Sequence, residues 1–315
     1  MKTPIIQTFN LTKKYGKLLA VDNLNLEISK GIYGFLGPNG AGKTTTIKML
    51  IGSLLPTSGH IEIFGEDITG NKNMSIHERL GYVPEHPTYF LGMTADKLLR
   101  YIGSIFHMSK QEIDKRISDL LKLVNLTEAR NRAIVKYSAG MKQRFGIAQA
   151  LMNDPELLIL DEITSNLDPL GRNAMINLIN DLRKEGKTIF ISTHVLPEIQ
   201  KMNVDSIGII NEGHLVMEGS LDELNKKLGR KLVRLKPNNE MFRKSLEPLV
   251  LTISEESNAL IFETDQLEKA WQTIADISLK NNIAVSEFRS SEFEIEQIFL
   301  KAINKKEIRR EEKSE

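Results

Sequence analysis

A glycine-rich run, GPNGAGKT at residues 37–44, holds the side chains best suited to chemistry. It satisfies the pattern G-x-x-x-x-G-K-[ST], in which successive backbone N–H groups converge on phosphate oxygens. The Lys43 amine could reach the β and γ phosphates of a nucleoside triphosphate, and the Thr44 hydroxyl could ligate Mg²⁺. An ordinary turn with an incidental lysine is the alternative. We favour a phosphate-binding loop because an apolar run precedes it and a helical pattern follows, so that a helix N-terminus would add its dipole.

Two carboxylates, Asp161 and Glu162, directly follow the apolar run LLIL at 157–160. If that run is a strand of a parallel sheet, its carboxyl end faces the phosphate-binding loop. Asp161 would then hold Mg²⁺, and Glu162 could polarise the attacking water. A strand that ends in two solvated acids is the alternative, which the presence of the phosphate-binding loop disfavours.

The phosphate-binding loop by itself does not distinguish ATP from GTP. DITG at 67–70 resembles the D-x-x-G of GTPases, but no N-K-x-D follows it to recognise guanine. We therefore expect DITG to form a turn after a strand.

Apolar patterns predict the elements that must position these residues. The predicted strands are 31–36, 157–160 and 188–192, and the predicted helices between them are 44–55 and 171–184. This alternation predicts an α/β fold with a mostly parallel sheet. Before residue 28 the side chains alternate as in β-strands, which indicates a β subdomain. Helical spacing from 93 to 154, with a capping box at Ser109 and Glu112, indicates an inserted helical lobe at about 90–150.

A change of pattern near Lys226 predicts a second domain. Residues 226–236 contain six basic residues and no acidic one, which is typical of a solvated connector or a lysine-protected strand edge, and less so of a lipid contact. Short strands and two helices, at 266–280 and 291–304, then predict a small α+β domain in which Trp271 belongs to the core. The expected domains are 1–227 and 228–305, followed by a charged tail at 306–315.

Composition sets wider limits on the fold and the function. A length of 315 residues suggests about two domains, and 41% hydrophobic with 26% charged residues is typical of globular chains. Because the chain has no cysteine, disulfides, Cys-ligated metals and thiol catalysis are excluded. A net charge of +1 favours neither nucleic acid nor an anionic membrane as a partner. The sequence lacks an apolar run long enough for a membrane span and a signal-like start, so we expect a cytoplasmic protein.

Further motifs stand in the order found in ATP-binding-cassette (ABC) ATPases, and about residues 4–225 resemble that family. The motifs that carry the resemblance are a signature, YSAGMKQR at 137–144; a D-loop, TSNLD at 164–168; a Q-loop, GYVPEHP at 81–87; a switch histidine, His194; and an aromatic residue placed to stack on adenine, Tyr15. Alone, His194 or Tyr15 would more often be structural. Their places in the ordered set favour the functional interpretation.

The resemblance implies a set of site residues. The implied catalytic residues are Lys43, Glu162 and His194, and the implied metal ligands are Thr44, Glu85 and Asp161. The implied ATP-binding residues are Tyr15, Gly37, Pro38, Asn39, Gly40, Ala41, Gly42, Lys43, Thr44, Thr45, Ser138, Ala139, Gly140 and Asp168. In this family the helix start at Ser138 grips the γ-phosphate of ATP bound to the opposite subunit.

Four positions depart from the family pattern. Glu85 replaces the Q-loop glutamine, Ala139 the first signature glycine and Ile163 a proline, while Asn166 alters the D-loop. None removes a charge essential to phosphoryl transfer. Glu85 could still ligate Mg²⁺, whereas Ala139 adds a methyl group where backbone approaches phosphate. The variants together resemble exporter-type ATPases that work with a separate membrane subunit.

The resemblance therefore implies the ATP-hydrolysing subunit of an ABC exporter, peripheral on the inner face of the cell membrane. Two copies, or one copy and a paralogue, would sandwich two ATP, and a membrane permease would dock at roughly residues 85–131. A soluble ABC ATPase that acts on ribosomes or DNA is the alternative. Such proteins usually carry two cassettes or long coiled-coil insertions, whereas this chain has one phosphate-binding loop, so no nucleic-acid partner is expected.

Overall fold

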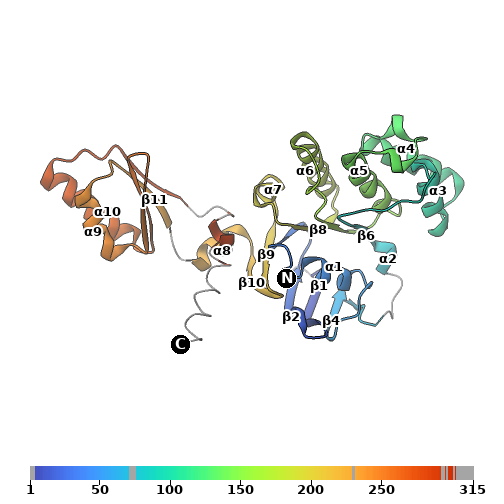
Figure 1. Ribbon diagram of the computed structural model, residues 1–315, viewed down its shortest axis with the longest axis horizontal. Helices are drawn as coiled ribbons and strands as arrows, with labels where there is room; N and C mark the ends of the chain where they lie inside the picture. The colour runs from blue at the N-terminus through green and yellow to red at the C-terminus, as the bar shows by residue number, and fades with distance from the viewer. Residues whose placement is uncertain are drawn as a thin grey trace. The chain divides into compact units, whose positions relative to one another are not determined.

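The computed structural model describes residues 4–70, 76–228 and 231–291, together with 295, 297–300 and 302. The chain divides into two compact units, Met1–Glu218 and Gly219–Glu315, which Figure 1 shows in blue to yellow and in orange to red. Sequence analysis placed the division later, after residue 227. The predicted charged tail at 306–315 lies outside the described residues.

The N-terminal unit contains an antiparallel sheet in the order β2-β1-β4-β5. Its strands are β1 (Ile6–Tyr15), β2 (Leu18–Ile28), β4 (Ser58–Ile63) and β5 (Glu66–Asp67). Alternate side chains of β2 are buried, as the sequence pattern predicted for this region. Asp67 ends β5 and its carboxylate accepts a hydrogen bond from Thr69 N at 2.8 Å, so DITG forms the expected turn.

A six-stranded sheet, in the order β10-β9-β3-β8-β7-β6, forms the centre of this unit. Its strands are β3 (Ile32–Leu36), β6 (Leu80–Val83), β7 (Leu157–Asp161), β8 (Thr188–Thr193), β9 (Ser206–Asn211) and β10 (His214–Gly219). Strands β9, β3, β8, β7 and β6 run parallel to their neighbours, so the predicted mostly parallel sheet is present. Every residue of β3, β7 and β8 is buried, which explains their continuous apolar runs.

Helices cover both faces of the six-stranded sheet. Helix α1 (Lys43–Leu50) buries Ile47, Met49 and Leu50 in a core shared with both sheets. Helices α6 (Pro169–Lys184) and α7 (Leu196–Lys201) lie on the other face (Figure 1). Sequence analysis expected α1 to extend to residue 55, but it ends at Leu50, where the chain turns through Gly52 at φ 72°.

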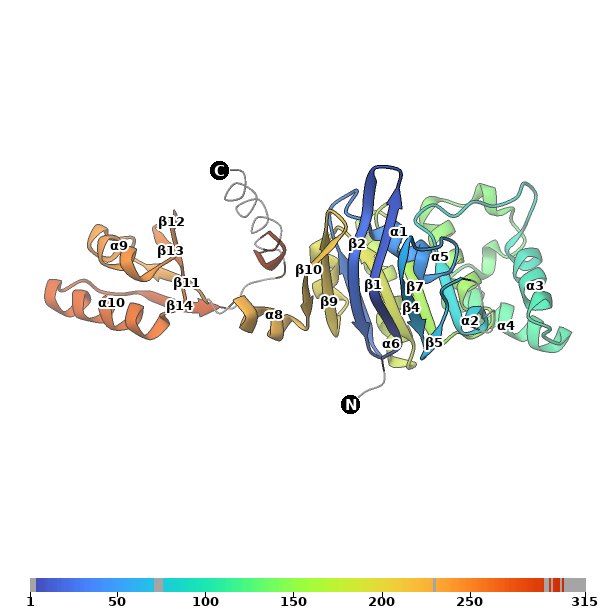
Figure 2. The same cartoon turned by 90° about the horizontal axis from the view of Figure 1, so that it is seen from below.

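The predicted helical lobe lies beside β6, as Figure 2 shows in green. It consists of α3 (Ala95–Ile105), α4 (Lys110–Leu123), α5 (Ala139–Ala150) and two short 3₁₀ turns, while α2 (Ile76–Arg79) precedes β6. Ser109 Oγ accepts from Glu112 N, and the Glu112 carboxylate accepts from Ser109 N, so the predicted capping box is confirmed. Every described helix of the chain is too short or too polar to span a membrane.

The second unit starts with α8 (Leu221–Leu228) and then follows the order β-α-β-β-α-β. Its elements are β11 (Lys231–Lys236), α9 (Glu240–Leu246), β12 (Thr252–Glu256), β13 (Ala259–Thr264), α10 (Leu267–Asn281) and β14 (Glu287–Ser291). The antiparallel sheet has the order β12-β13-β11-β14, which is the ferredoxin-like arrangement. Helices α9 and α10 share one apolar core with β11 and β13.

Three expectations for the second unit need correction. The basic run is no edge or linker over its second half, because Lys231–Lys236 is an inner strand whose Lys236 pairs with Glu287 at 2.9 Å. Trp271 is 46% exposed and packs on Phe288 at the rim of the core. Ser291 ends β14, so it does not begin the helix predicted from 291 to 304, whereas the described residues 295, 297–300 and 302 are helical as predicted.

Candidate active site

The phosphate-binding loop joins the carboxyl end of β3 to the first residue of α1. Gly42 caps α1 at φ 108°, a left-handed conformation that side chains rarely adopt, and a Cβ there would lie 2.5 Å from Ala20 O. A Cβ on Gly37 would lie 2.5 Å from Ile210 O. The two glycines are therefore required for the loop to pass between β2 and β9 and to aim its N–H groups at one point.

Lys43 is the first residue of α1, and its side chain is 5% exposed. Its amine donates to Gly37 O at 2.7 Å and to Pro38 O at 3.1 Å. It also lies 3.1 Å from Glu162 Oε1. The buried ammonium is thus paired with one carboxylate and hydrogen-bonded to two carbonyl oxygens of the phosphate-binding loop.

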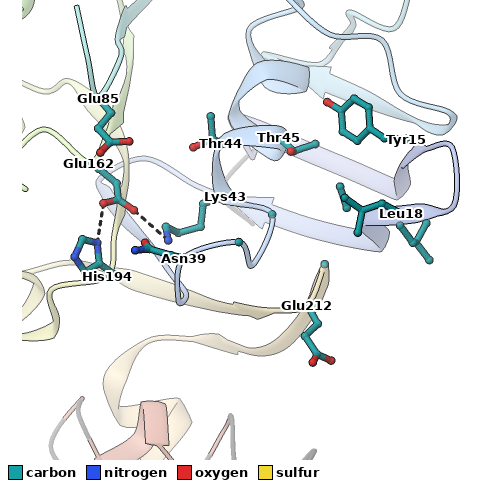
Figure 3. A pocket seen from close by; sticks show the side chains of 15 residues that line it. Tyr15, Leu18, Asn39, Lys43, Thr44, Thr45, Glu85, Glu162, His194 and Glu212 are labelled. Atoms are coloured by element: carbon teal, nitrogen blue, oxygen red, sulfur yellow. Dashed lines mark hydrogen bonds and ion pairs between the residues drawn. The ribbon is translucent and has the colours of Figure 1, made fainter.

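Glu162 lies one residue beyond β7 and touches two candidate catalytic groups. While Oε1 faces Lys43, Oε2 lies 2.7 Å from His194 Nδ1 (Figure 3). The Glu162 backbone has a φ of 47°, which is uncommon outside glycine, and its N–H donates to Ser192 Oγ at 3.1 Å. A strained backbone that aims a buried carboxylate at a pocket is a feature often found at functional sites.

Asp161, the last residue of β7, is buried beside Thr44. Its Oδ1 accepts a hydrogen bond from Ser192 Oγ at 2.6 Å, and the Thr44 side chain donates a second one. Burial raises the pKa of Asp161 above its ordinary value, although these hydrogen bonds and the Lys43 charge oppose the shift. A buried carboxylate next to a hydroxyl offers the hard oxygen ligands that suit Mg²⁺, so these residues fit the expected cation.

Lys43, Thr44, Glu162 and His194 line one cavity of about 680 Å³, and Asp161 lies behind this wall, hydrogen-bonded to Thr44. Tyr15, Asn39, Gly40, Gly42, Thr45 and Glu85 are further predicted residues on its wall, and Leu18, Leu19, Ala20, Glu212 and Gly213 complete it. Figure 3 shows Tyr15 and Leu18 at the end of the cavity away from Glu162 and His194. Tyr15 is 46% exposed, and the amine of Lys13 lies over its ring, 5.4 Å from the centroid.

A second cavity, of about 480 Å³, collects the other predicted residues. Ser138, Ala139, Gly140 and Asp168 line it together with Asn166, Leu167 and the start of α6. Ser138 is the N-cap of α5, since its Oγ accepts from Met141 N at 3.3 Å, and its hydroxyl hydrogen stays available to donate. Asp168 caps α6 through Gly171 N at 2.8 Å.

The predicted residues therefore fall into two groups within one copy of the chain. The phosphate-binding loop, Glu162 and His194 share the first cavity, whereas the signature and Asp168 share the second. Sequence reasoning missed Leu18 and Leu19, which line the first cavity; two adjacent apolar residues at the start of a strand, both exposed, were the available signal. Ser192 was also missed, and nothing in its spacing marked it as the partner of both acids.

Comparison with known proteins identifies the family. Residues 21–165 match the family described as ABC transporter. The Bacitracin transport ATP-binding protein BcrA of Bacillus licheniformis is 48% identical over 225 residues, which cover 71% of this chain and 72% of BcrA. The Daunorubicin/doxorubicin resistance ATP-binding protein DrrA of Streptomyces peucetius is 32% identical over 306 residues, which cover 95% of this chain and 92% of DrrA.

Solved structures agree with the sequence comparison. A structure described as the ATP binding subunit of an ABC transporter is 28% identical, with a TM-score of 0.65, and covers 71% of this chain and 93% of that one. The predicted α/β cassette fold is confirmed by this match. The chain therefore belongs to the ABC transporter ATP-binding proteins, and it is an ATP-hydrolysing subunit that powers a membrane transporter.

Proposed function

We propose that this chain works in an exporter, as a peripheral subunit on the inner face of a membrane permease. The observation that carries the proposal is its similarity to BcrA and DrrA, whose names refer to bacitracin transport and to daunorubicin and doxorubicin resistance. The match to DrrA covers 95% of this chain, so it extends into the second unit. The cargo would contact the permease, and this chain would couple ATP hydrolysis to the movement of the permease.

We propose that the first cavity binds ATP with the adenine on Tyr15 and the phosphates in the loop. The Lys43 ammonium would leave Glu162 for the β and γ phosphate oxygens, to which the same charge is attracted. Thr44 and Asp161 would hold Mg²⁺, which neutralises charge on the phosphates when bound. Glu85 lines the same wall and could add a ligand.

Hydrolysis would follow from the position of Glu162 and His194. The Glu162 carboxylate accepts a proton from water while the water oxygen forms a bond to the γ-phosphorus, and the bond to the β,γ-bridging oxygen breaks. His194, 2.7 Å from Glu162, orients that carboxylate. ADP stays bound to Lys43 and the loop while inorganic phosphate leaves.

We propose that two cassettes act together, as two copies or as one copy with a paralogue. The second cavity presents the Ser138 hydroxyl and the N-terminus of α5, a twelve-residue helix, which suits a phosphate group. Within one copy this cavity is separate from the phosphate-binding loop. A γ-phosphate in the first cavity of one subunit could therefore meet the second cavity of its partner.

Coexpression with a candidate membrane permease, sought among the reading frames next to that of this chain, tests the proposal. The pair should copurify and raise resistance of a sensitive host to bacitracin or daunorubicin, and Lys43→Ala should abolish that resistance. Lys48→Ala is the matched control, because Lys48 lies on the same helix and faces solvent. Failure to copurify would argue against the permease, and resistance that survives Lys43→Ala would argue against ATP-driven export.

A further inference from the structure

Glu198 is a buried carboxylate that no step above uses. The residue is 4% exposed and lies in α7, which begins directly after the segment that carries His194. Thr164 Oγ1 donates a hydrogen bond to Glu198 Oε2, and Arg172 Nε lies 3.4 Å from Glu198 Oε1. Among the described residues Oε1 has no hydrogen bond, so charge alone holds that ion pair. Thr164 and Arg172 offset the desolvation free energy that burying this carboxylate costs. An apolar side chain at this position would carry no such cost, so the carboxylate needs another explanation.

The Thr164 contact forms the second of two connections between the ends of β7 and β8. The first joins Glu162 to His194 at 2.7 Å. Thr164 lies two residues beyond Glu162, and Glu198 lies four residues beyond His194. Ile163, between the two contacts, is fully buried. Segments joined at two points cannot rotate about either one, so the second contact limits how the imidazole and the Glu162 carboxylate can turn relative to each other.

The same carboxylate reaches the segment that lines the second cavity. Arg172 lies in the first turn of α6, where its N–H donates to Asp168 O at 2.9 Å. Between Thr164 and Arg172 the residues at 166–168 line the cavity that holds the signature. Glu198 therefore contacts this segment near its start and just after its end. One buried carboxylate thus contacts Thr164, two residues beyond Glu162, and Arg172, just past the wall of the second cavity.

We infer that Glu198 is a positioning residue for ATP hydrolysis, which holds the segment from Thr164 to Arg172 against α7. Glu198 lines neither cavity. Without it Glu162 keeps its charge but loses its fixed orientation toward the water. ATP binding through the phosphate-binding loop stays intact, because Lys43 and Thr44 are held by separate contacts.

A pair of Thr164 variants tests the contact with little change of shape. Thr164→Val removes the hydroxyl donor, and kcat should fall about tenfold, the scale expected when a supporting group lets a catalytic residue shift, while KM for ATP changes less than about twofold. Thr164→Ser restores the hydroxyl and should recover most of kcat. Glu198→Gln keeps an acceptor for Thr164 and loses the charge that faces Arg172, so an intermediate loss is expected. Thr164→Val combined with Glu198→Gln should be no slower than the slower single variant, since the groups act as one unit.

Asp205→Asn is the control for losing a carboxylate that pairs with an arginine of α6, because Asp205 directly precedes β9 and pairs with Arg183. Asp205 pairs with Arg183 at the far end of α6 and accepts from Ile32 N at 2.8 Å, at the sheet edge away from the nucleotide. It should lower the melting temperature with kcat unchanged. Equal losses of kcat in Asp205→Asn and Thr164→Val, or full kcat in folded Thr164→Val, would overturn the inference. Equal losses in Thr164→Ser and Thr164→Val would do the same. The assay needs ATP hydrolysis by the purified chain only, so it stands apart from the proposal of export.

Discussion

The two cavities of the cassette differ in the source of their chemistry. The first contains a buried ion pair, Lys43 with Glu162, whose carboxylate also lies against the partly exposed His194. The second is lined chiefly by small and neutral residues at the starts of α5 and α6, where backbone N–H groups and capping side chains face outward. Preorganised charge suits bond breaking, whereas helix starts suit reversible capture of a phosphate. Under the proposed function, the first cavity carries out the reaction and the second binds the γ-phosphate of ATP held by a partner subunit.

The largest effect is expected when the negative charge of Glu162 is removed from the first cavity. Glu162→Gln keeps the shape but cannot accept a proton, so the ATPase rate should fall ~10²–10⁴-fold, about 3–5 kcal/mol of barrier. Binding should persist because Lys43 and the loop are unchanged. The variant should therefore form a dimer in ATP by size-exclusion chromatography, with wild type mainly monomeric.

Two outcomes of the Glu162→Gln experiment would contradict this expectation. Near wild-type turnover in Glu162→Gln would assign the water to another group, with Glu85 and His194 as the next candidates on the same wall. Lost turnover without a dimer would mean either that the methyl group of Ala139, at the first position of α5, weakens the grip of the second cavity or that the working partner is a different ATPase chain.

The second cavity should respond through association more than through chemistry. Ser138→Ala removes the hydroxyl that would donate to a γ-phosphate, and a hydrogen bond to a charged group contributes about 1.5–3 kcal/mol. In the Glu162→Gln background we expect ATP-dependent dimerisation to weaken about tenfold or more, measured by sedimentation.

Ser109→Ala separates that effect from the loss of a helix cap. Ser109 caps α4 in the same manner, and its Oγ accepts from Glu112 N at 3.3 Å, but it lines neither cavity. Both variants should lose about 1 kcal/mol of folding free energy. Equal weakening of the dimer by both would show that the second cavity does not bind phosphate.

Lowering the pH should weaken the binding of Mg²⁺ in the first cavity. Because burial raises the pKa of Asp161, a proton persists on this carboxyl to a higher pH than on an exposed aspartate, and that proton competes with Mg²⁺. As pH falls toward the raised pKa, the Mg²⁺ concentration that gives half-maximal ATPase activity should rise several-fold. Asp161→Asn should need more Mg²⁺ at every pH and lose most of this dependence. An unchanged pH profile in Asp161→Asn would place the titrating group elsewhere.

Local motifs account for how much of the site was predictable. Residues 37–44 and the acids at 161–162 were recognised because each motif is contiguous and its flanks fix the element that carries it. The Thr164–Glu198 contact was invisible because it depends on β7 and β8 being neighbours in parallel register, Asp161 opposite Ser192. Spacing along the chain does not encode such pairings.

The second unit shows the same limit. The six basic residues at 226–236 were interpreted as a connector. Composition does not reveal that Lys236 and Arg234 pair with Glu287 across an antiparallel sheet. Its four strands and α10 were predicted from their patterns, α8 and α9 were missed, and the ferredoxin-like strand order follows from long-range pairing. Trp271 was misplaced for a related reason: helical spacing gives its face, not the depth of the core beneath it.

The smallest expected effect concerns this unit. A stop after residue 228 keeps both cavities and all strands of the cassette, whose sheet ends at β10. The cores of the two units share no residue, so the cassette should fold without the second unit. We expect the ATPase rate of the truncated chain to stay within about twofold of wild type and its melting temperature within a few degrees. If the truncated chain is insoluble, or if its rate falls as far as that of Glu162→Gln, the second unit takes part in building one of the two cavities and the division into independent units is wrong.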